Sequence, residues 1–406
     1  MKYILKAKTH SLKGNINLPA SKSISNRILI IEALAQTHFS VKNLSKAKDT
    51  EVLKAALDKN EIITDVGPAG TAMRFLTAFY ASQPGEKILT GSDRMKNRPI
   101  NILVDALRKL GAEITYLEKE GYPPLRIDGR RLQGGTLKVA GNISSQFITA
   151  LMLIGPTLPQ SLIIEIEGDP LSRPYILMTQ ALMQSCGAQV EINEQRIEIM
   201  PGRYRSKDYE IEQDWSAAAF WMAFAVAGRK VDFTLLNLKP QSIQGDQSCV
   251  ELFEALGVSS EYTEKGLRIR KGEAANKSVE WNLRDHPDLV QPASIAAAIG
   301  KINLTMHGLD NLRLKETDRI NAVETELKKI GIKATVNGHS MTINAGEMTN
   351  PSQYFEAYDD HRMVMAIAPL SLVFDEIIIE NPLVVSKSYP SFWKEVEKFV
   401  DVRPMR

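Results

Sequence analysis

The sequence contains little cysteine. Cys186 and Cys249 are the two cysteines among 406 residues, too few for a disulfide framework and typical of a reduced, cytosolic protein. Each lies in a segment with helical spacing of apolar residues, so we interpret both as packed residues rather than catalytic thiols. The six histidines are scattered, and none has the Cys/His spacing of a metal site. We therefore expect no bound metal.

The chain also lacks an excess of charge of either sign. Its 50 Lys and Arg against 48 Asp and Glu give a formal net charge of +2, which predicts no general attraction to nucleic acid or to an anionic membrane. The longest apolar runs, such as residues 217–227, are shorter than the roughly 20 residues that cross a bilayer. The N-terminal segment alternates like a strand and has no signal-peptide or transit-peptide pattern, so we expect a cytoplasmic protein.

Two common phosphate-binding loops are missing as well. No GxGxxG occurs, and no Gly-Lys-Ser/Thr follows the glycine-containing segment 65–71. These absences argue against a Rossmann dehydrogenase and a P-loop kinase. Any preference for acidic ligands must come from local clusters of Lys and Arg.

A weak internal repeat is the most informative large-scale feature that the sequence does contain. In four segments, an apolar stretch with helical spacing ends in glycine and runs into an alternating stretch; the glycines, roughly 70 residues apart, are Gly111, Gly187, Gly257 and Gly331. Glycine is typical of the position just after a helix. About six helix–strand copies would fill the chain, which predicts an α/β (α+β) fold in two domains. The polar segment 201–214 favours a boundary near residues 211–213.

Several predicted helices of the first half begin with small residues close to a cation. Lys22 and Arg27 lie at the start of the segment 18–35, and Gly70 and Thr71 precede Arg74. The N-terminus of a helix suits an anion, and small residues let a ligand approach the backbone. Ordinary helix capping is the alternative for each segment taken singly. The same pattern recurs at Arg98, at Ser144, Ser145 and Gln146, and at Ser172 to Tyr175.

The second half mixes carboxylates with cations. Asp288 opens a small-residue helix, and the segment NLRLKETDR holds Asn311, Lys315, Glu316 and Arg319. Lys315 and Arg319 are four residues apart and are predicted to share a helix face, where like charges repel unless an anion lies between them. A solvated charged face is the alternative for this segment alone. Taken together with Arg362 and Lys387, the segments of both halves fit two polyanionic ligands held between two domains.

Nine motifs occur in order along the whole chain: ASKSISNR, GPAGTAMR, MKNRPI, SSQF, SRPY, HPD, NLRLKETDR, DDHRM and SKSYP. Together they resemble the EPSP synthase family of enolpyruvyl transferases. The resemblance implies a two-domain inside-out α/β barrel, each domain with three βαβαββ units about a pseudo-threefold axis and the active site in the interdomain cleft. It implies that residues 20–211 form the N-terminal-type domain, which binds shikimate 3-phosphate. Residues 1–19 and 212–406 would form the C-terminal-type domain, which binds phosphoenolpyruvate and carries the catalytic carboxylates.

The resemblance also implies a reaction. The enolpyruvyl group of phosphoenolpyruvate would pass to the 5-hydroxyl of shikimate 3-phosphate, giving 5-enolpyruvylshikimate 3-phosphate and phosphate, a step of chorismate and aromatic amino-acid biosynthesis. Asp288 and Glu316 would transfer protons with Lys22 as the cationic proton carrier, and no cofactor or metal is needed. We expect a monomer that binds neither nucleic acid nor membrane and that glyphosate, a mimic of phosphoenolpyruvate, inhibits.

Binding residues carry over position by position. Phosphoenolpyruvate would bind Lys22, Gly70, Arg98, Gln146, Arg319, Arg362 and Lys387. Shikimate 3-phosphate would bind Lys22, Ser23, Arg27, Ser144, Ser145, Gln146, Ser172, Tyr175, Asp288, Asn311 and Lys315. The chain departs from the family at Pro68, where many members have Asn; proline has neither an amide side chain nor a backbone N–H to donate.

Two other functions fit parts of the pattern. One is the enolpyruvyl transferase that acts on UDP-N-acetylglucosamine, whose loop usually carries a reactive cysteine. Neither Cys186 nor Cys249 lies in a comparable glycine-rich loop, which disfavours it. The other is a non-catalytic anion-binding protein of the same fold, which has no need of carboxylates such as Asp288 and Glu316 among its cations.

Overall fold

The computed structural model describes residues 1–59, 61–141, 144–168, 170–310, 312–351 and 353–405. The chain divides into two compact units. Unit 1 consists of Met1–Pro19 and Glu212–Arg406, and unit 2 of Ala20–Ile211. The chain therefore passes from unit 1 into unit 2 after Pro19 and returns after Ile211.

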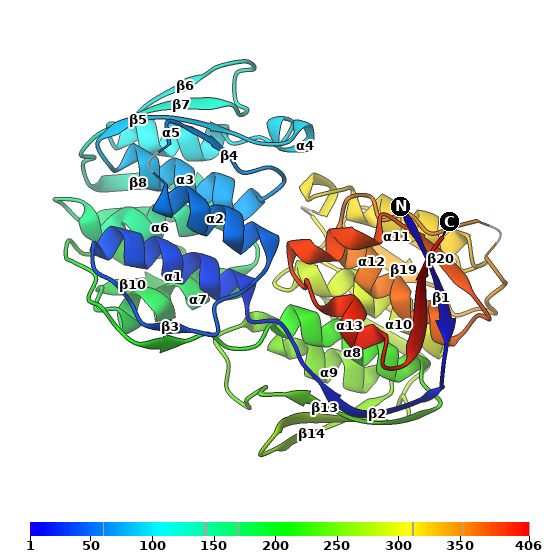
Figure 1. Cartoon of the computed structure of the whole chain (residues 1–406). Helices are drawn as coiled ribbons and strands as arrows, with labels where there is room; N and C mark the ends of the chain where they lie inside the picture. Colours follow the sequence, from blue (N-terminus) through cyan, green and yellow to red (C-terminus); the bar gives the residue numbers. More distant parts are fainter. Residues whose placement is uncertain (60, 142–143, 169, 311, 352, 406) are drawn as a thin grey trace. The chain divides into compact units, whose positions relative to one another are not determined.

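Unit 2 contains two four-stranded sheets of one design. In each, the first strand pairs in parallel with the second, and a hairpin of two further strands adds antiparallel to the second, giving the orders β4-β5-β7-β6 and β8-β9-β11-β10. With the helices between the strands, each is a βαβαββ unit (Figure 1). Their elements are β4 Ile63–Asp65, α3 Gly70–Ala81, β5 Gly85–Thr90, α4 Asp93–Lys96, α5 Asn101–Lys109, β6 Glu113–Tyr116 and β7 Leu125–Gly129, then β8 Gly135–Ala140, α6 Ser145–Ile154, β9 Leu162–Glu167, α7 Arg173–Ser185, β10 Val190–Asn193 and β11 Arg196–Ile199.

Unit 1 contains two more sheets of the same design, in the orders β2-β13-β15-β14 and β16-β17-β19-β18. In the first of them the opening strand comes from the N-terminal segment, before the chain enters unit 2. The elements are β2 Ser11–Ile16, α8 Trp215–Ala227, β13 Lys230–Leu236, α9 Cys249–Ala255, β14 Val258–Thr263, β15 Gly266–Lys271, β16 Ser278–Asn282, α10 Val290–Gly300, β17 Asn303–His307, α11 Arg319–Lys328, β18 Ala334–Asn337 and β19 Ser340–Ile343.

The third copy in each unit is shorter than the other two. Among the described residues, each unit therefore contains two full βαβαββ copies where three were expected. In unit 1, β1 pairs antiparallel with β20 and β21, which joins the two ends of the chain (Figure 1). In unit 2, β3 pairs in parallel with β12, and each strand has two residues. The elements are β1 Lys2–Ala7, α12 His361–Ile367, β20 Ile377–Glu380, α13 Phe392–Val396 and β21 Val400–Pro404, and α1 Lys22–Ala35, β3 Val41–Lys42, α2 Lys48–Asp58 and β12 Tyr209–Glu210.

The four glycines of the sequence repeat end helices as predicted. Each follows one of the helices α5, α7, α9 and α11 and precedes a strand, and the four φ angles lie between 78° and 97°. That left-handed conformation is strained for a residue with a Cβ. The repeat in the sequence is therefore a repeat of helix ends in the structure.

The core of unit 1 is built around α8. Asp214 caps this helix by accepting a hydrogen bond from the backbone of Ala217 at 2.9 Å, and most of its residues are fully buried. A helix that is apolar on all sides belongs in a protein core, and α8 packs against α10 and α9. Trp221 stacks on Phe224. Within the described part of the chain, no helix combines the length and the hydropathy needed to cross a bilayer.

Unit 2 buries a charged side chain between three helices. Arg27 of α1 is 3% exposed; its Nε donates to the Thr179 hydroxyl of α7 at 2.8 Å and its Nη2 to the Thr149 hydroxyl of α6 at 3.4 Å. Burial lowers the pKa of Arg27 to about 10, and the electrostatic effect of nearby Tyr175 partly offsets this decrease. The guanidinium therefore remains charged near neutral pH, and its hydrogen bonds join α1, α6 and α7.

We predict that Thr179→Val destabilises the protein by about 2 kcal/mol, because the buried Nε of Arg27 loses its acceptor. The measurement is the free energy of unfolding in urea. Thr77→Val is the matched control: Thr77 is equally buried, and its hydroxyl donates to the Met73 carbonyl at 2.7 Å just as the Thr179 hydroxyl donates to the Tyr175 carbonyl at 2.7 Å. The comparison therefore isolates the bond that Thr179 accepts from Arg27. Equal losses in the two variants would contradict a role for Thr179 in satisfying Arg27.

Candidate active site

Arg319 is the centre of a charged network in unit 1. It is the first residue of α11, and Asp318 caps that helix by accepting a hydrogen bond from the backbone of Asn321 at 3.1 Å. The prediction that Lys315 and Arg319 share a helix face is wrong, because Lys315 lies in the bend before this cap. Because α11 begins after this cap, the segment 315–317 does not follow the helical geometry.

Each of the three nitrogens of the Arg319 guanidinium donates to a different carboxylate. Nε contacts Asp360 at 2.9 Å, Nη1 contacts Asp288 at 2.8 Å, and Nη2 contacts Glu316 at 3.1 Å. The side chain is 2% exposed. Burial alone would lower the pKa of Arg319, but the charges of Asp360, Glu316 and Asp288 outweigh burial and raise it. Arg319 is therefore a permanent, buried cation whose position is determined by three carboxylates.

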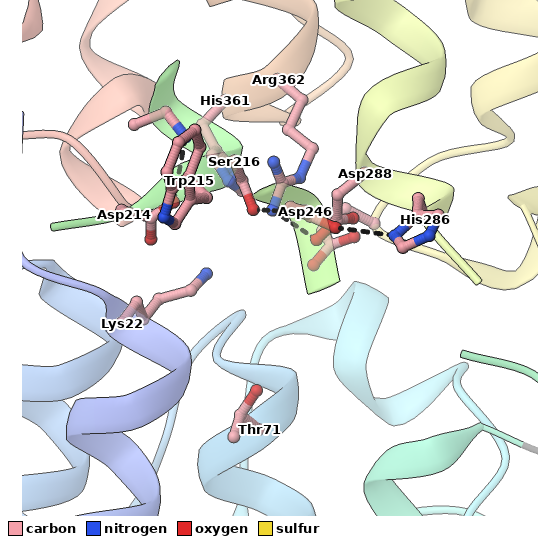
Figure 2. A network of polar contacts seen from close by, with 12 residues as sticks. Lys22, Thr71, Asp214, Trp215, Ser216, Asp246, His286, Asp288, His361 and Arg362 are labelled. Carbon is pink, nitrogen blue, oxygen red and sulfur yellow. Dashed lines mark hydrogen bonds and ion pairs between the residues drawn. The ribbon is translucent and has the colours of Figure 1, made fainter. Parts of the chain in front are cut away.

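Asp288 joins Arg319 to a second buried arginine. One carboxylate oxygen faces Arg319 and the other accepts from Nη2 of Arg362 at 2.6 Å; Figure 2 shows Asp288 and Arg362 in the network. Burial alone would raise the pKa of Asp288, but the positive charges of Arg362, Arg319 and Lys315 hold it well below its usual range. Asp288 is therefore ionised throughout the neutral range, and its ion pairs stabilise the fold until the pH falls through that low pKa.

Glu316 makes the equivalent bridge on the other side of Arg319. Its second oxygen lies 3.3 Å from Nζ of Lys387, which is 5% exposed at the end of the short helix η6 Pro382–Lys387. Three buried cations thus alternate with carboxylates: Lys387, Glu316, Arg319, Asp288 and Arg362 follow one another through direct ion pairs. The structure therefore brings together five predicted residues of this unit, with Lys315 close enough to act on Asp288. Asn311 lies outside the described residues.

Reasoning from the sequence missed two features beside this network. Asp360 stands in the DDHRM motif but was not assigned a role, although an acidic residue before a helix is a capping signal. His286, two residues before Asp288, lies with its Nδ1 3.7 Å from Asp246, which in turn accepts from the Ser216 hydroxyl (Figure 2). These contacts tie the segment that carries Asp288 to the start of α8.

Lys22 is the first residue of α1 in unit 2. Ser21 caps this helix by accepting from the backbone of Ile24 at 3.4 Å. The Lys22 ammonium forms an ion pair with Asp49 at 3.1 Å, and the exposures of the two side chains are 14% and 6%. Within unit 2, Lys22 is thus paired with the carboxylate of Asp49, a residue 27 positions away in the sequence.

Gly70 and Arg98 meet in the same unit. Gly70 begins α3, and a Cβ added there would come within 2.7 Å of Nη1 of Arg98. Arg74, one turn further along, donates to the Gly70 carbonyl at 3.4 Å and to the Pro99 carbonyl at 3.5 Å, which links the start of α3 to the segment that carries Arg98. Pro68 lies in the turn before α3. The lack of a side chain at position 70 therefore makes room for a guanidinium.

The remaining predicted residues of unit 2 lie at the starts of α6 and α7. Ser144 caps α6, and Gln146 Nε2 donates to the Thr71 hydroxyl at 3.3 Å, which ties α6 to α3. Ser172 precedes α7 at φ 56° and is 3% exposed; a left-handed serine in a buried position is a strained arrangement of the kind found at binding sites. Ser145 is buried, Ser23 is half-buried, and the Tyr175 carbonyl accepts from Arg27 at 3.4 Å.

Both cysteines are packed residues, as the sequence predicted. Burial raises the pKa of Cys186, and it raises the pKa of Cys249 well above the ordinary value. A buried thiol with a raised pKa is a poor nucleophile. Among the residues that the structure describes, no group of three His, Cys, Asp or Glu side chains could hold a metal ion.

Comparisons with known proteins agree on one family. A family model described as EPSP synthase (3-phosphoshikimate 1-carboxyvinyltransferase) matches residues 6–59 and 51–396. A 3-phosphoshikimate 1-carboxyvinyltransferase from Bacteroides fragilis is 43% identical over 401 residues, covering 98% of each chain. One from Psychromonas ingrahamii is 34% identical over 432 residues, covering 98% of this chain and 99% of its own.

The similarity extends to solved structures. An EPSP synthase from Acinetobacter baumannii superposes with a TM-score of 0.80 at 21% identity, over 99% of this chain and 100% of its own. At that identity the likeness establishes the fold. Because the family model spans most of the sequence and the curated relatives match it over nearly their full length, the chain belongs to the EPSP synthase family.

Proposed function

We propose that this protein is a 3-phosphoshikimate 1-carboxyvinyltransferase, which transfers the enolpyruvyl group of phosphoenolpyruvate to the 5-hydroxyl of shikimate 3-phosphate. The observation that carries the assignment is the network of unit 1, in which Arg319, Arg362 and Lys387 are buried and alternate with Asp288 and Glu316. Buried cations bind a small polyanion, and carboxylates among them can move protons. The curated relatives carry the same activity in their names.

Phosphoenolpyruvate would bind by exchange with the protein's own carboxylates. Its carboxylate and phosphate groups offer the same kind of oxygen that Asp288 and Glu316 now present to the three cations. When the substrate takes a share of Arg362 and Arg319, their effect on Asp288 weakens, and the pKa of Asp288 rises toward the ordinary value. Binding would thereby convert a weak base into a more effective one.

The chemistry proceeds by addition and elimination. The shikimate 5-hydroxyl gives up its proton and attacks carbon 2 of phosphoenolpyruvate while carbon 3 gains a proton, which forms a tetrahedral ketal. The ketal then loses a proton from carbon 3 and expels phosphate, which leaves the enol ether. We assign the proton transfers to Asp288 and Glu316, with Lys22 as the cationic proton carrier, and the stabilisation of the departing phosphate to the cations.

Shikimate 3-phosphate would bind the residues carried over from the family. The N-termini of α6 and α7, with hydroxyls beside them, suit its phosphate group, and Arg27 suits its carboxylate. Gly70 and Arg98 would contribute to phosphoenolpyruvate binding. The assigned residues of unit 2 are Lys22, Ser23, Arg27, Ser144, Ser145, Gln146, Ser172 and Tyr175, and those of unit 1 are Asp288, Lys315 and Asn311.

One assay separates this function from its rivals. The protein is expected to release phosphate when phosphoenolpyruvate and shikimate 3-phosphate are both present. Release with UDP-N-acetylglucosamine instead would identify the other enolpyruvyl transferase, a function that the buried cysteines disfavour. No release with either acceptor would identify an anion-binding protein. We also propose a cytoplasmic monomer.

Glu316→Gln is expected to lower turnover roughly 100-fold or more, because the amide cannot accept a proton. The dissociation constant for shikimate 3-phosphate, whose assigned contacts do not include Glu316, should change little. Steady-state kinetics and a binding titration measure the two effects. The control is Glu324→Gln, a partly exposed residue of α11, the helix that follows the Glu316 segment. Near-normal turnover in Glu316→Gln would remove Glu316 from the proton-transfer step.

Gly70→Ala is expected to raise KM for phosphoenolpyruvate about tenfold, the scale of one weakened charge-assisted hydrogen bond. The added methyl group would lie 2.7 Å from Nη1 of Arg98 and force the guanidinium aside. KM for shikimate 3-phosphate and the melting temperature should stay close to those of the parent. In the control Gly202→Ala, the new methyl meets no atom within 4 Å. An unchanged KM for phosphoenolpyruvate would show that Arg98 tolerates the displacement.

Glyphosate should inhibit the protein in competition with phosphoenolpyruvate. The reason is that Gly70 has no side chain to push the Arg98 guanidinium aside, so an anionic mimic of this substrate would meet the same cation. Initial rates at several concentrations of each substrate test this, and inhibition should be relieved by phosphoenolpyruvate alone. Full activity at glyphosate concentrations well above that of phosphoenolpyruvate would contradict the expectation.

A further inference from the structure

Asp360 is a buried carboxylate that contacts two of the three cationic residues of the network. Its side chain is 0% exposed. Oδ2 accepts from Nε of Arg319 at 2.9 Å, and Oδ1 accepts from the backbone N–H of Arg362, also at 2.9 Å, which caps α12. One carboxylate thus contacts the side chain of one cationic residue and the backbone of another. The contacts link the starts of α11 and α12.

The contact of Asp360 with Nε determines how the Arg319 guanidinium is oriented. A guanidinium is planar and rigid, so fixing Nε fixes the direction of the other two nitrogens. Those two nitrogens, Nη1 and Nη2, face Asp288 and Glu316. Asp360 therefore occupies the nitrogen nearest the stem of Arg319 and leaves the outer pair for the carboxylates that move protons or for a substrate anion. A guanidinium whose orientation is already fixed loses little conformational entropy when an anion binds to it.

The cap that Asp360 provides for α12 determines the position of Arg362. Asp360 sets where α12 begins, and Arg362 is the second residue of that helix. The Arg362 side chain then reaches Asp288 at 2.6 Å, the same carboxylate that Arg319 contacts. The two arginines thus share Asp360 on one side of the network and Asp288 on the other. Removing the Asp360 charge should loosen this pairing without removing either cation.

We propose that Asp360 is a positioning residue, which orients Arg319 and Arg362 as a pair for the anionic groups of phosphoenolpyruvate. The inference rests on the proposed function and adds to it a residue that makes no contact with the reacting atoms. It predicts that Asp360 controls the affinity for phosphoenolpyruvate and leaves that for shikimate 3-phosphate largely unchanged. A residue that merely capped α12 would affect stability instead.

Asp360→Asn separates these two roles. Asparagine caps helices about as well as aspartate, so its oxygen can keep the bond to the Arg362 backbone. Its amide N–H₂ then faces Nε–H of Arg319, donor against donor, and the guanidinium must turn away. KM for phosphoenolpyruvate should rise at least tenfold, while KM for shikimate 3-phosphate stays within about twofold. Should this variant fail to fold, Asp360→Ser, which also retains a capping oxygen, repeats the test.

Asp318→Asn is the matched control. Asp318 also caps a helix of this unit, but its side chain pairs with Arg313, which is exposed. This variant should leave both KM values within about twofold of the parent. If Asp360→Asn behaves like Asp318→Asn, the positioning role is overturned. If the parent protein itself releases no phosphate from the two substrates, the proposed function has failed instead.

A double-mutant cycle with Arg319→Lys tests the route of the effect. Lysine lacks an Nε–H at that point of the side chain, so the contact with Asp360 is already lost in Arg319→Lys. Adding Asp360→Asn to this background should then change KM for phosphoenolpyruvate by less than about threefold. If Asp360→Asn raises KM by the same factor in both backgrounds, the residue does not act through Arg319 and the inference is overturned.

Discussion

The structure of unit 1 depends on how it satisfies a buried guanidinium. An isolated charge in a protein interior is unfavourable by many kcal/mol, so a buried arginine must be paired and hydrogen-bonded. Arg319, at 2% exposure, meets this requirement with three carboxylates from three separate segments of the chain. The need to satisfy one side chain thus brings the starts of α10 and α12 and the bend before α11 to one place. The carboxylates that pair with Arg319 are also part of the candidate site.

The network that stabilises the fold is also the one that must rearrange for function. Asp288 and Glu316 hold Arg319, Arg362 and Lys387 by ion pairs that a substrate anion has to share or replace. The positive charges of Arg362, Arg319 and Lys315 hold the pKa of Asp288 well below its usual range. A preformed set of cations needs little reorganisation when a substrate binds, which is the usual advantage of a preorganised electrostatic site. Asp360, which has no direct part in the chemistry, keeps that set in place.

Unit 2 also contains a buried arginine, but the hydrogen-bond partners of this arginine are neutral. Arg27 is buried among hydroxyls and backbone carbonyls of α1, α6 and α7 rather than among carboxylates. Burial lowers its pKa, yet the cation persists near neutral pH. Among the residues that the structure describes, the partners of Arg27 are neutral oxygens, which leaves its positive charge suited to an anionic ligand. The hydroxyls that satisfy Arg27 also hold together the helices whose N-termini carry the assigned serines.

The sequence by itself determined the local features of this protein. The four repeat glycines mark helix ends because a left-handed position is strained for any other residue, and the packed cysteines follow from apolar spacing alone. The ordered motifs identified the family, whose residues then named most of the candidate site. The inferences about glycines and cysteines depend on residues within a few positions of one another, where backbone geometry and capping rules are sufficient. The site residues came instead from the resemblance of the nine motifs to the family.

Only the tertiary structure decided how the charges pair. Lys22 lies against Asp49, Asp288 against Arg362, and Asp360 against Arg319, and the partners are separated by long stretches of chain. Local rules even misplaced Lys315 on α11, because Asp318 caps the helix one residue before Arg319. The choice among many carboxylates is made by burial, since a buried cation requires an acceptor wherever the packing of several helices brings one within reach.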